Sequence, residues 1–129
     1  MKINHFGYAV KNIDKSIKDF VLLGYSIDDT EYEDLNRQVK IRFIEMDGIR
    51  LELIEPMGEK SPVNDLIKKN GNILYHICYE TIKFEDDIQN LVDNGFILIE
   101  KPKKAVALDR NKVAFLYKKS VGIVEVVEG

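Results

Sequence analysis

The sequence predicts an α+β fold in which two tandem βαβββ modules form one curved, eight-stranded mixed sheet with helices on its convex face. Two observations favour this fold: the chain contains an internal repeat, and both copies show the same order of strand and helix patterns. A third is size, because a module of about 60 residues buries little core by itself. The 129 residues suit a single domain, with module one at about 1–60, a linker helix at about 61–70 and module two at about 71–129.

The repeat appears when INHFGYAVKNIDKSIKDFVLLGYSI is set above LYHICYETIKFEDDIQNLVDNGFIL. One constant shift, without gaps, aligns His5 with His76, Tyr8 with Tyr79, Ile17 with Ile88, and Gly24 with Gly95. The aligned residues include both histidines of the chain. The two halves are therefore expected to share one local structure.

In module one, residues 2–10 are expected to form a strand, and a helix follows because Ile13, Ile17 and Phe20 recur at helical spacing. Asn12 or Asp14 is expected to cap its start, and Gly24 its end. The segments GYSIDD, QVKIRFIEM and IRLELIE then predict three strands.

In module two, residues 73–81 predict the first strand, and Phe84, Ile88 and Leu91 predict the helix, which ends near Gly95. Strands are expected at GFILIE, KVAFLY and GIVEVV. Between the modules, SPVNDLIKKNG predicts a short helix with Ser61 as its cap and Pro62 in its first position.

The charge, the apolar runs and the cysteine count of the chain argue against several classes of protein. The net charge is −3 and lysines are interleaved with acidic residues, so no basic face for nucleic acid is expected. No apolar run reaches the roughly 18 residues that indicate a membrane span, and MKINHFGYAV lacks a signal-peptide core. The single cysteine, Cys78, excludes an intrachain disulfide and a zinc site of several cysteines. The cytoplasm is the expected location.

Four polar residues occupy repeated positions in strands that are otherwise apolar. Each module supplies a histidine from its first strand, His5 or His76, and a glutamate from its last, Glu52 or Glu125. Strand alternation places both glutamates on the face opposite their leucine and valine neighbours. Two imidazoles and two carboxylates would suit one divalent ion, Zn²⁺, Mn²⁺, Fe²⁺, Co²⁺ or Ni²⁺, with positions left for water or substrate.

A structural interpretation stands beside this one. A single strand histidine more often bonds a backbone group than a metal, and a single strand glutamate usually faces water. The matched positions of both pairs favour the metal site. Cys78 has the parity of His76, so it either lines the same cavity or serves packing as a small buried residue, and packing is the favoured interpretation.

At these residues the chain resembles the vicinal oxygen chelate superfamily, which includes glyoxalase I, extradiol dioxygenases and methylmalonyl-CoA epimerase. The segments that carry the resemblance are INHFGYAVKNIDKSIKDF, LELIEPMGEKSPVNDLIKKNGNILYHICYE and GIVEVVE, and they are most similar to the epimerase branch. The resemblance implies His5, Glu52, His76 and Glu125 as metal ligands. Glu52 stands where some epimerases carry glutamine, which is closer to the glyoxalase pattern.

The resemblance implies an isomerase or lyase that abstracts a proton next to a thioester or ketone carbonyl and forms a metal-stabilised enediolate, as methylmalonyl-CoA epimerase and lactoylglutathione lyase do. Glu125 is implied as the base, with Glu52 as the second candidate. A small-molecule substrate such as an acyl-CoA is implied. Homodimers are common in the superfamily, although the sequence shows no interface.

The chain departs from the epimerase pattern where a second acid/base is usual. Before the strand that begins at Val39 the sequence reads LNRQV, and the nearest carboxylates, Glu33 and Asp34, are displaced. The stretch after the sixth strand is also altered, to LYKKSVG. Arg37 and Arg42 are either contacts for an anionic substrate or solvated strand charges. The lysines within 101–104 either meet a coenzyme A phosphate or lie in an exposed loop.

Two other functions remain open. An extradiol-type dioxygenase would use Fe²⁺, but such enzymes typically have three ligands. A non-catalytic drug-binding protein of the bleomycin-resistance type shares the fold but generally lacks the full ligand set. The presence of all four residues favours catalysis.

Overall fold

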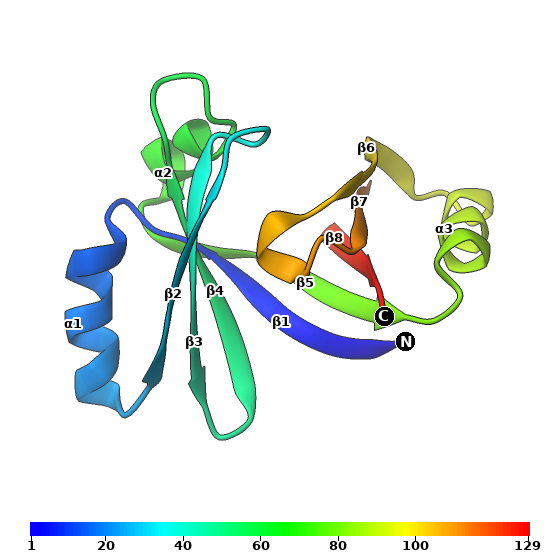
Figure 1. Cartoon of the computed structure of the whole chain (residues 1–129). Helices are drawn as coiled ribbons and strands as arrows, with labels where there is room; N and C mark the ends of the chain where they lie inside the picture. Colours follow the sequence, from blue (N-terminus) through cyan, green and yellow to red (C-terminus); the bar gives the residue numbers. More distant parts are fainter. The chain divides into compact units, whose positions relative to one another are not determined.

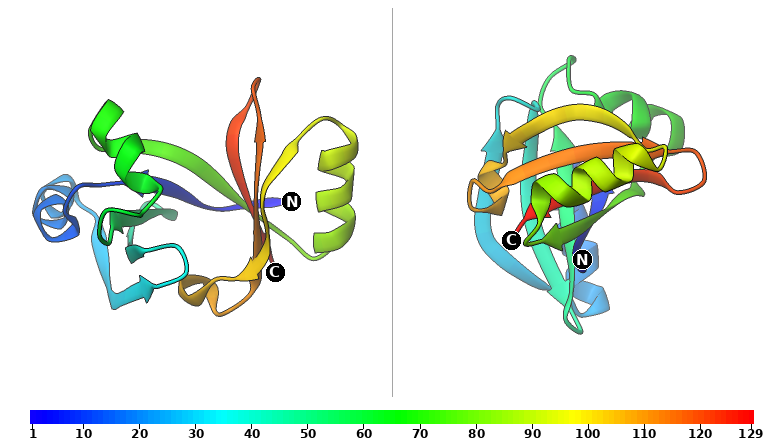
Figure 2. Two further views of the ribbon diagram at one scale, coloured as in Figure 1. Left: turned by 90° about the horizontal axis from the view of Figure 1, so that it is seen from above. Right: turned by 90° about the vertical axis from the view of Figure 1, so that its right-hand side faces the viewer.

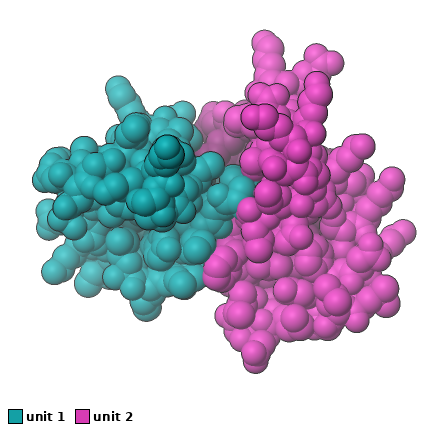
Figure 3. Space-filling model, turned by 180° about the vertical axis from the view of Figure 1, so that it is seen from behind, with its two compact units in different colours: residues 1–5, 75–129 teal, residues 6–74 magenta.

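The computed structural model describes residues 1–129 and divides into two compact units (Figure 3). Unit 1 consists of Met1–His5 and Tyr75–Gly129, and unit 2 consists of Phe6–Leu74. The strands β1 (Lys2–Ala9) and β5 (Ile73–Thr81) each run from one unit into the other. The strand order is β2-β3-β4-β1-β5-β8-β7-β6, which confirms the predicted eight-stranded mixed sheet made by two βαβββ modules.

Unit 2 continues after β1 with α1 (Ile13–Leu23), the strands β2 (Ser26–Asp34), β3 (Val39–Met46) and β4 (Ile49–Pro56), and the helix α2 (Val63–Asn70) (Figure 1). β4 lies parallel to β1 and antiparallel to β3. A β-bulge interrupts the pairing of β2 with β3.

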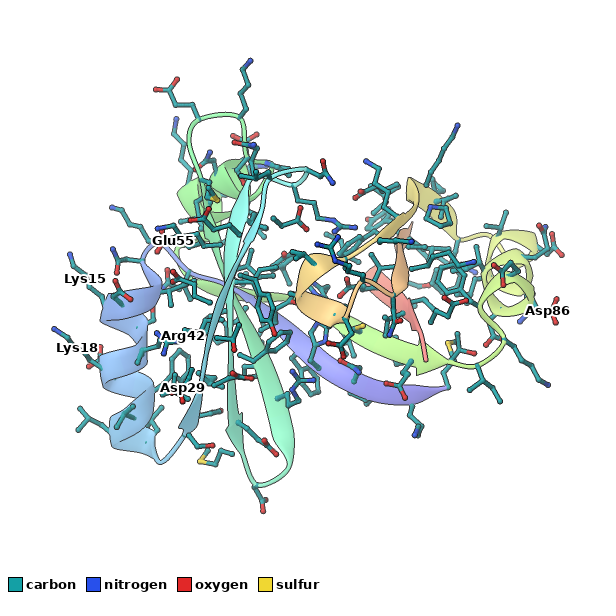
Figure 4. All side chains as sticks on the ribbon, in the orientation of Figure 1. Lys15, Lys18, Asp29, Arg42, Glu55 and Asp86 are labelled. Carbon is teal, nitrogen blue, oxygen red and sulfur yellow. The ribbon has the colours of Figure 1, made fainter.

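The helix α1 forms where the apolar spacing predicts it. The side chain of Asn12 accepts a hydrogen bond from the Lys15 amide at 2.9 Å, so Asn12 is the cap. Gly24 ends the helix with a φ of 111°, a conformation that residues with a side chain rarely adopt. The helix packs on β4 through a buried cluster that includes Val10, Ile13, Ile44, Leu51 and Leu53. Lys15 and Lys18 project from its exposed side (Figure 4).

The prediction for the linker helix is off by one residue. Pro62 is the cap residue of α2 and not its first helical position. The Ser61 hydroxyl accepts only a long bond, 3.4 Å, from the Val63 amide. The helix is followed by Gly71, as the sequence predicts.

Unit 1 contains α3 (Phe84–Asp93), β6 (Ile97–Lys104), a short 3₁₀ turn (Val106–Leu108), β7 (Lys112–Lys118) and β8 (Gly122–Glu128). β8 lies parallel to β5 and antiparallel to β7. The helix α3 lies across the strands of this unit (Figure 2, right). Its core cluster is Phe84, Ile88, Ala114, Leu116, Val124 and Val126.

β6 differs from its prediction. An exposed loop was one of the two interpretations of the lysines within 101–104. These lysines instead belong to this edge strand, where Lys103 pairs with Val113 of β7. Pro102 is tolerated because an edge strand has unpaired amide positions, and the pairing is irregular between Glu100 and Lys103. The lysines are exposed, and Lys103 forms an ion pair with Glu100 at 3.3 Å.

None of the helices combines the length and the apolar character that crossing a membrane requires.

Candidate metal centre

Three of the four residues predicted as metal ligands converge within unit 1. His5 lies on β1, His76 on β5 and Glu125 on β8. Oε1 of Glu125 lies 3.1 Å from Nε2 of His5 and 3.1 Å from Nε2 of His76. The ligand atoms of these three residues all lie within 4.8 Å of one another. Two imidazole nitrogens and a carboxylate oxygen therefore meet at one point.

Strand alternation explains why Glu125 points to this site. Val124 and Val126 pack in the core cluster with α3, so the residue between them faces the other side of the sheet. Its register partner on β5 is Cys78, two residues beyond His76 on the same face. The predicted parity of His76, Cys78 and Glu125 is confirmed. Cys78 is fully buried, as expected for a packing residue.

Burial makes this cluster electrostatically strong. His5, His76 and Glu125 are 0%, 4% and 4% exposed. Desolvation by itself would raise the pKa of Glu125, but the hydrogen bonds and charges of His5 and His76 outweigh it and hold that pKa well below its usual range. The carboxylate is therefore kept in the ionised form that binds cations.

Asn4 fixes the orientation of the His5 ring. Nδ2 of Asn4 donates a hydrogen bond to Oε1 of Glu80 at 3.0 Å. Because a carboxylate oxygen can only accept, the nitrogen of the Asn4 amide must face Glu80, and its oxygen faces His5. That oxygen lies 2.7 Å from Nδ1 of His5, which must then be the donor. In the neutral ring Nε2 is left with a lone pair aimed at the Glu125 carboxylate. A lone pair facing a carboxylate at 3.1 Å is stable only with a cation or a proton between them.

Aromatic rings pack around His76. Tyr75 meets it edge-to-face with ring centroids 4.6 Å apart, and Phe115 does so at 5.4 Å. Phe115 is the register partner of Glu125 on β7. These contacts restrict the His76 ring, and restricted ligands lose less entropy on metal binding.

Glu52 lies on β4 in unit 2 and is 4% exposed. Leu51 and Leu53 pack toward α1, so the Glu52 side chain faces the opposite side of the strand, as predicted. Its register partners are Gly7 on β1 and Phe43 on β3.

The residues considered for substrate contact have partners of their own. Asp34 is buried, and its carboxylate accepts bonds from the backbone amide of Arg37 at 3.1 Å and from the Arg37 guanidinium at 2.9 Å. Arg42 donates from Nε to the Asp28 carbonyl oxygen at 2.9 Å. Glu33 is exposed. In unit 2, Asp34 is thus used in an ion pair that closes the β2–β3 turn.

Sequence reasoning missed Asn4, Glu80 and Phe115. Asn4 and Glu80 act through a hydrogen-bond chain between β1 and β5, and only the register of those strands reveals it. The one available signal was the position of Asn4 beside a predicted ligand histidine.

Comparison with known proteins agrees with the fold. Residues 4–115 match the family described as the glyoxalase/bleomycin resistance protein/dioxygenase superfamily, and the chain belongs to it. The mitochondrial methylmalonyl-CoA epimerase of Dictyostelium discoideum is 28% identical over 122 residues, covering 93% of this chain and 72% of that protein.

Solved structures share the fold. Hypothetical protein BH1468 from Bacillus halodurans C-125 superposes with a TM-score of 0.88 at 29% identity, covering 99% of this chain and 94% of that one. A Streptomyces coelicolor methylmalonyl-CoA epimerase variant in complex with 2-nitronate-propionyl-CoA gives a TM-score of 0.87 at 21% identity, covering 100% and 94%. The second likeness shows the fold alone.

Proposed function

We propose that this chain is a metal-dependent enzyme that removes and returns the proton next to a thioester carbonyl, in the manner of a methylmalonyl-CoA epimerase. The observation that carries the proposal is the convergence of His5, His76 and Glu125 on one point in unit 1. The relative from Dictyostelium discoideum, named as an epimerase of this kind, supports the choice of reaction.

Glu52 is the proposed fourth ligand, because the two modules repeat one register. On β5 and β8, Cys78 is the partner of Glu125, and His76 lies two residues earlier. On β1 and β4, Gly7 is the partner of Glu52, and His5 lies two residues earlier. In module two this register brings imidazole and carboxylate within 3.1 Å. The same register in module one supports a matching half-site from His5 and Glu52.

The donor set fits a divalent first-row ion such as Zn²⁺, Mn²⁺, Fe²⁺, Co²⁺ or Ni²⁺. When bound, such an ion acts as a Lewis acid that offsets the negative charge developing on the substrate oxygens. The neutral tautomer that Asn4 imposes on His5 keeps Nε2 available as a ligand. Homodimer formation, like the identity of the metal, stays a prediction.

The proton is moved by the ligand glutamates in this proposal. Glu125 is the proposed acceptor, because its carboxylate oxygen lies where the two histidine rings converge and so beside the reacting carbon of a substrate bound there. Glu52, protonated at this stage, delivers a different proton from the other half-site, because Asp34 is occupied by Arg37. Delivery of this proton on the opposite face inverts the carbon, which is epimerization.

A glyoxalase-type lyase is the second candidate, and one observation favours it. Asp34 is occupied by Arg37, and Glu33, the register partner of Lys40, lies on the face opposite Glu52, so the ligand carboxylates would shuttle the proton alone. That arrangement also suits transfer of a proton between the two carbons of a hemithioacetal.

The test is exchange of the substrate proton in heavy water by the metal-loaded protein. Methylmalonyl-CoA is expected to take up deuterium at its branched carbon, and His76→Ala is expected to abolish the exchange. The matched control is Asn111→Ala, an exposed residue remote in sequence from the ligands, which should leave the rate unchanged.

Product formation from the hemithioacetal of methylglyoxal and glutathione, without exchange into methylmalonyl-CoA, would replace the epimerase by the lyase. Inactivity with both compounds would contradict the proposal and favour a non-catalytic binding protein.

A further inference from the structure

A cavity of about 240 Å³ lies in unit 2 between β2, β3 and the start of β4. Residues that line it include Ser26, Asp28, Phe43, Glu45 and Arg50. Arg50 precedes Glu52 by two residues on β4, and Phe43 is the cross-strand partner of Glu52, so all three side chains share one face. Glu52 does not itself line the cavity, but Arg50 and Phe43, which do, are its neighbours on that face.

Arg50 is held in this cavity by an aromatic ring. Its Cζ lies 4.2 Å from the centroid of the Phe43 ring. Phe43 is only 2% exposed and contacts Tyr32 edge-to-face, with centroids 6.4 Å apart. Stacking on the ring fixes the plane of the guanidinium and leaves its N–H donors around the edge free to meet a planar carboxylate.

Two carboxylates also line the cavity, but neither forms an ion pair with Arg50. Asp28 is turned toward its own bulge, where Oδ1 accepts a bond from the Thr30 amide at 3.0 Å. Glu45 is the cross-strand register partner of Arg50 but forms no ion pair with it, and because Glu45 is exposed, water screens its charge. The Arg50 guanidinium is thus oriented and half-buried without a carboxylate partner.

We infer that Arg50 binds the free carboxylate of the substrate, so that the enzyme selects malonyl-type thioesters over neutral branched acyl thioesters. Arg50 and Glu52 are two residues apart on β4, which corresponds to about 7 Å along the strand. An arginine side chain and a three-carbon acid are together long enough to span that distance. The inference rests on the proposed function, because it requires the reacting carbon to lie beside Glu52.

Arg42 provides a matched control for Arg50. It lies on the adjacent strand, where its register partner is Leu53, a member of the core cluster under α1. Its side chain is therefore on the opposite face, toward α1 (Figure 4). Removing either charge changes the net charge of the protein equally, but only Arg50 faces the cavity.

The experiment measures methylmalonate binding to the metal-loaded protein by calorimetry. Arg50→Met is expected to weaken binding by about 10- to 100-fold, the usual effect of losing a hydrogen-bonded charge. Arg50→Lys should recover part of it, and Arg42→Met should bind as the wild type does. Equal binding by Arg50→Met and the wild type would overturn the inference.

A second measurement separates this inference from the proposed function. Binding of isobutyryl-CoA, which has no free carboxylate, is expected to be unchanged in Arg50→Met. An equal loss for both compounds would overturn the carboxylate assignment. If the wild type holds metal and exchanges the proton, but Arg50→Met binds methylmalonate as tightly as the wild type, only the role of Arg50 is refuted. A protein that neither holds metal nor exchanges protons would refute the proposed function itself.

Discussion

Nε2 of His76 lies 3.1 Å from Oε1 of Glu125, across the parallel pair β5 and β8. Nε2 of His5, which belongs to the first module, lies at the same distance from the same oxygen. Both imidazoles are buried, and burying polar groups in this way is costly unless they are paired or bind an ion. The arrangement fits the cation site proposed for this chain.

Asn4→Leu is expected to weaken metal binding about 10- to 100-fold, as loss of a group that orients a metal ligand typically does. The physical reason is that Nδ1 of His5 loses its acceptor, so the ring no longer favours the tautomer with Nε2 free. Metal titration monitored by calorimetry measures the effect, and Asn111→Ala serves as the exposed control. Unchanged affinity would mean that Asn4 does not control the ring.

Asp34→Asn is expected to lower stability while leaving the exchange rate per active molecule within about twofold of the wild type. Asp34 and Arg37 form a largely buried pair, and losing a hydrogen bond between charged groups costs about 1.5–3 kcal/mol. Urea unfolding gives the stability and deuterium exchange gives the rate. A rate that falls 100-fold in a folded variant would instead assign Asp34 as the missing second acid/base.

Glu55→Ala is expected to destabilise the protein by about 1 kcal/mol, with a range of about 0.5–2. Oε1 of Glu55, on β4, accepts a bond from the Ile13 amide at 2.8 Å and so places a negative charge at the start of α1 (Figure 4). Thermal unfolding compares it with Glu59→Ala, an exposed residue between β4 and α2. Equal unfolding midpoints for the two variants would contradict a capping role.

The repeat made much of the fold predictable, and it singled out the four candidate ligands. His5 and His76 could be found because the two modules kept the same residue at the same place, and strand alternation then gave the face of Glu52 and Glu125. These inferences need only the internal repeat and the alternation of side chains along a strand, and both can be read from the sequence.

Features that depend on contacts between distant segments were not predictable. The Asp34–Arg37 pair depends on the conformation of one turn, and the stacking of Arg50 on Phe43 depends on the β3–β4 register. The compact units also differ from the sequence modules, because Met1–His5 groups with the second half of the chain. Hydropathy does not reveal where such a boundary falls within a strand.

The central claim is that two histidines and two glutamates bind one divalent ion, and its most direct test is calorimetric titration of Mn²⁺ or Zn²⁺ into the metal-free protein. We expect one ion per chain, and a loss of at least tenfold in affinity for each of His5→Ala, Glu52→Ala, His76→Ala and Glu125→Ala. A Glu52→Ala variant that binds the ion as tightly as the wild type, or a wild type that binds none, would contradict the claim.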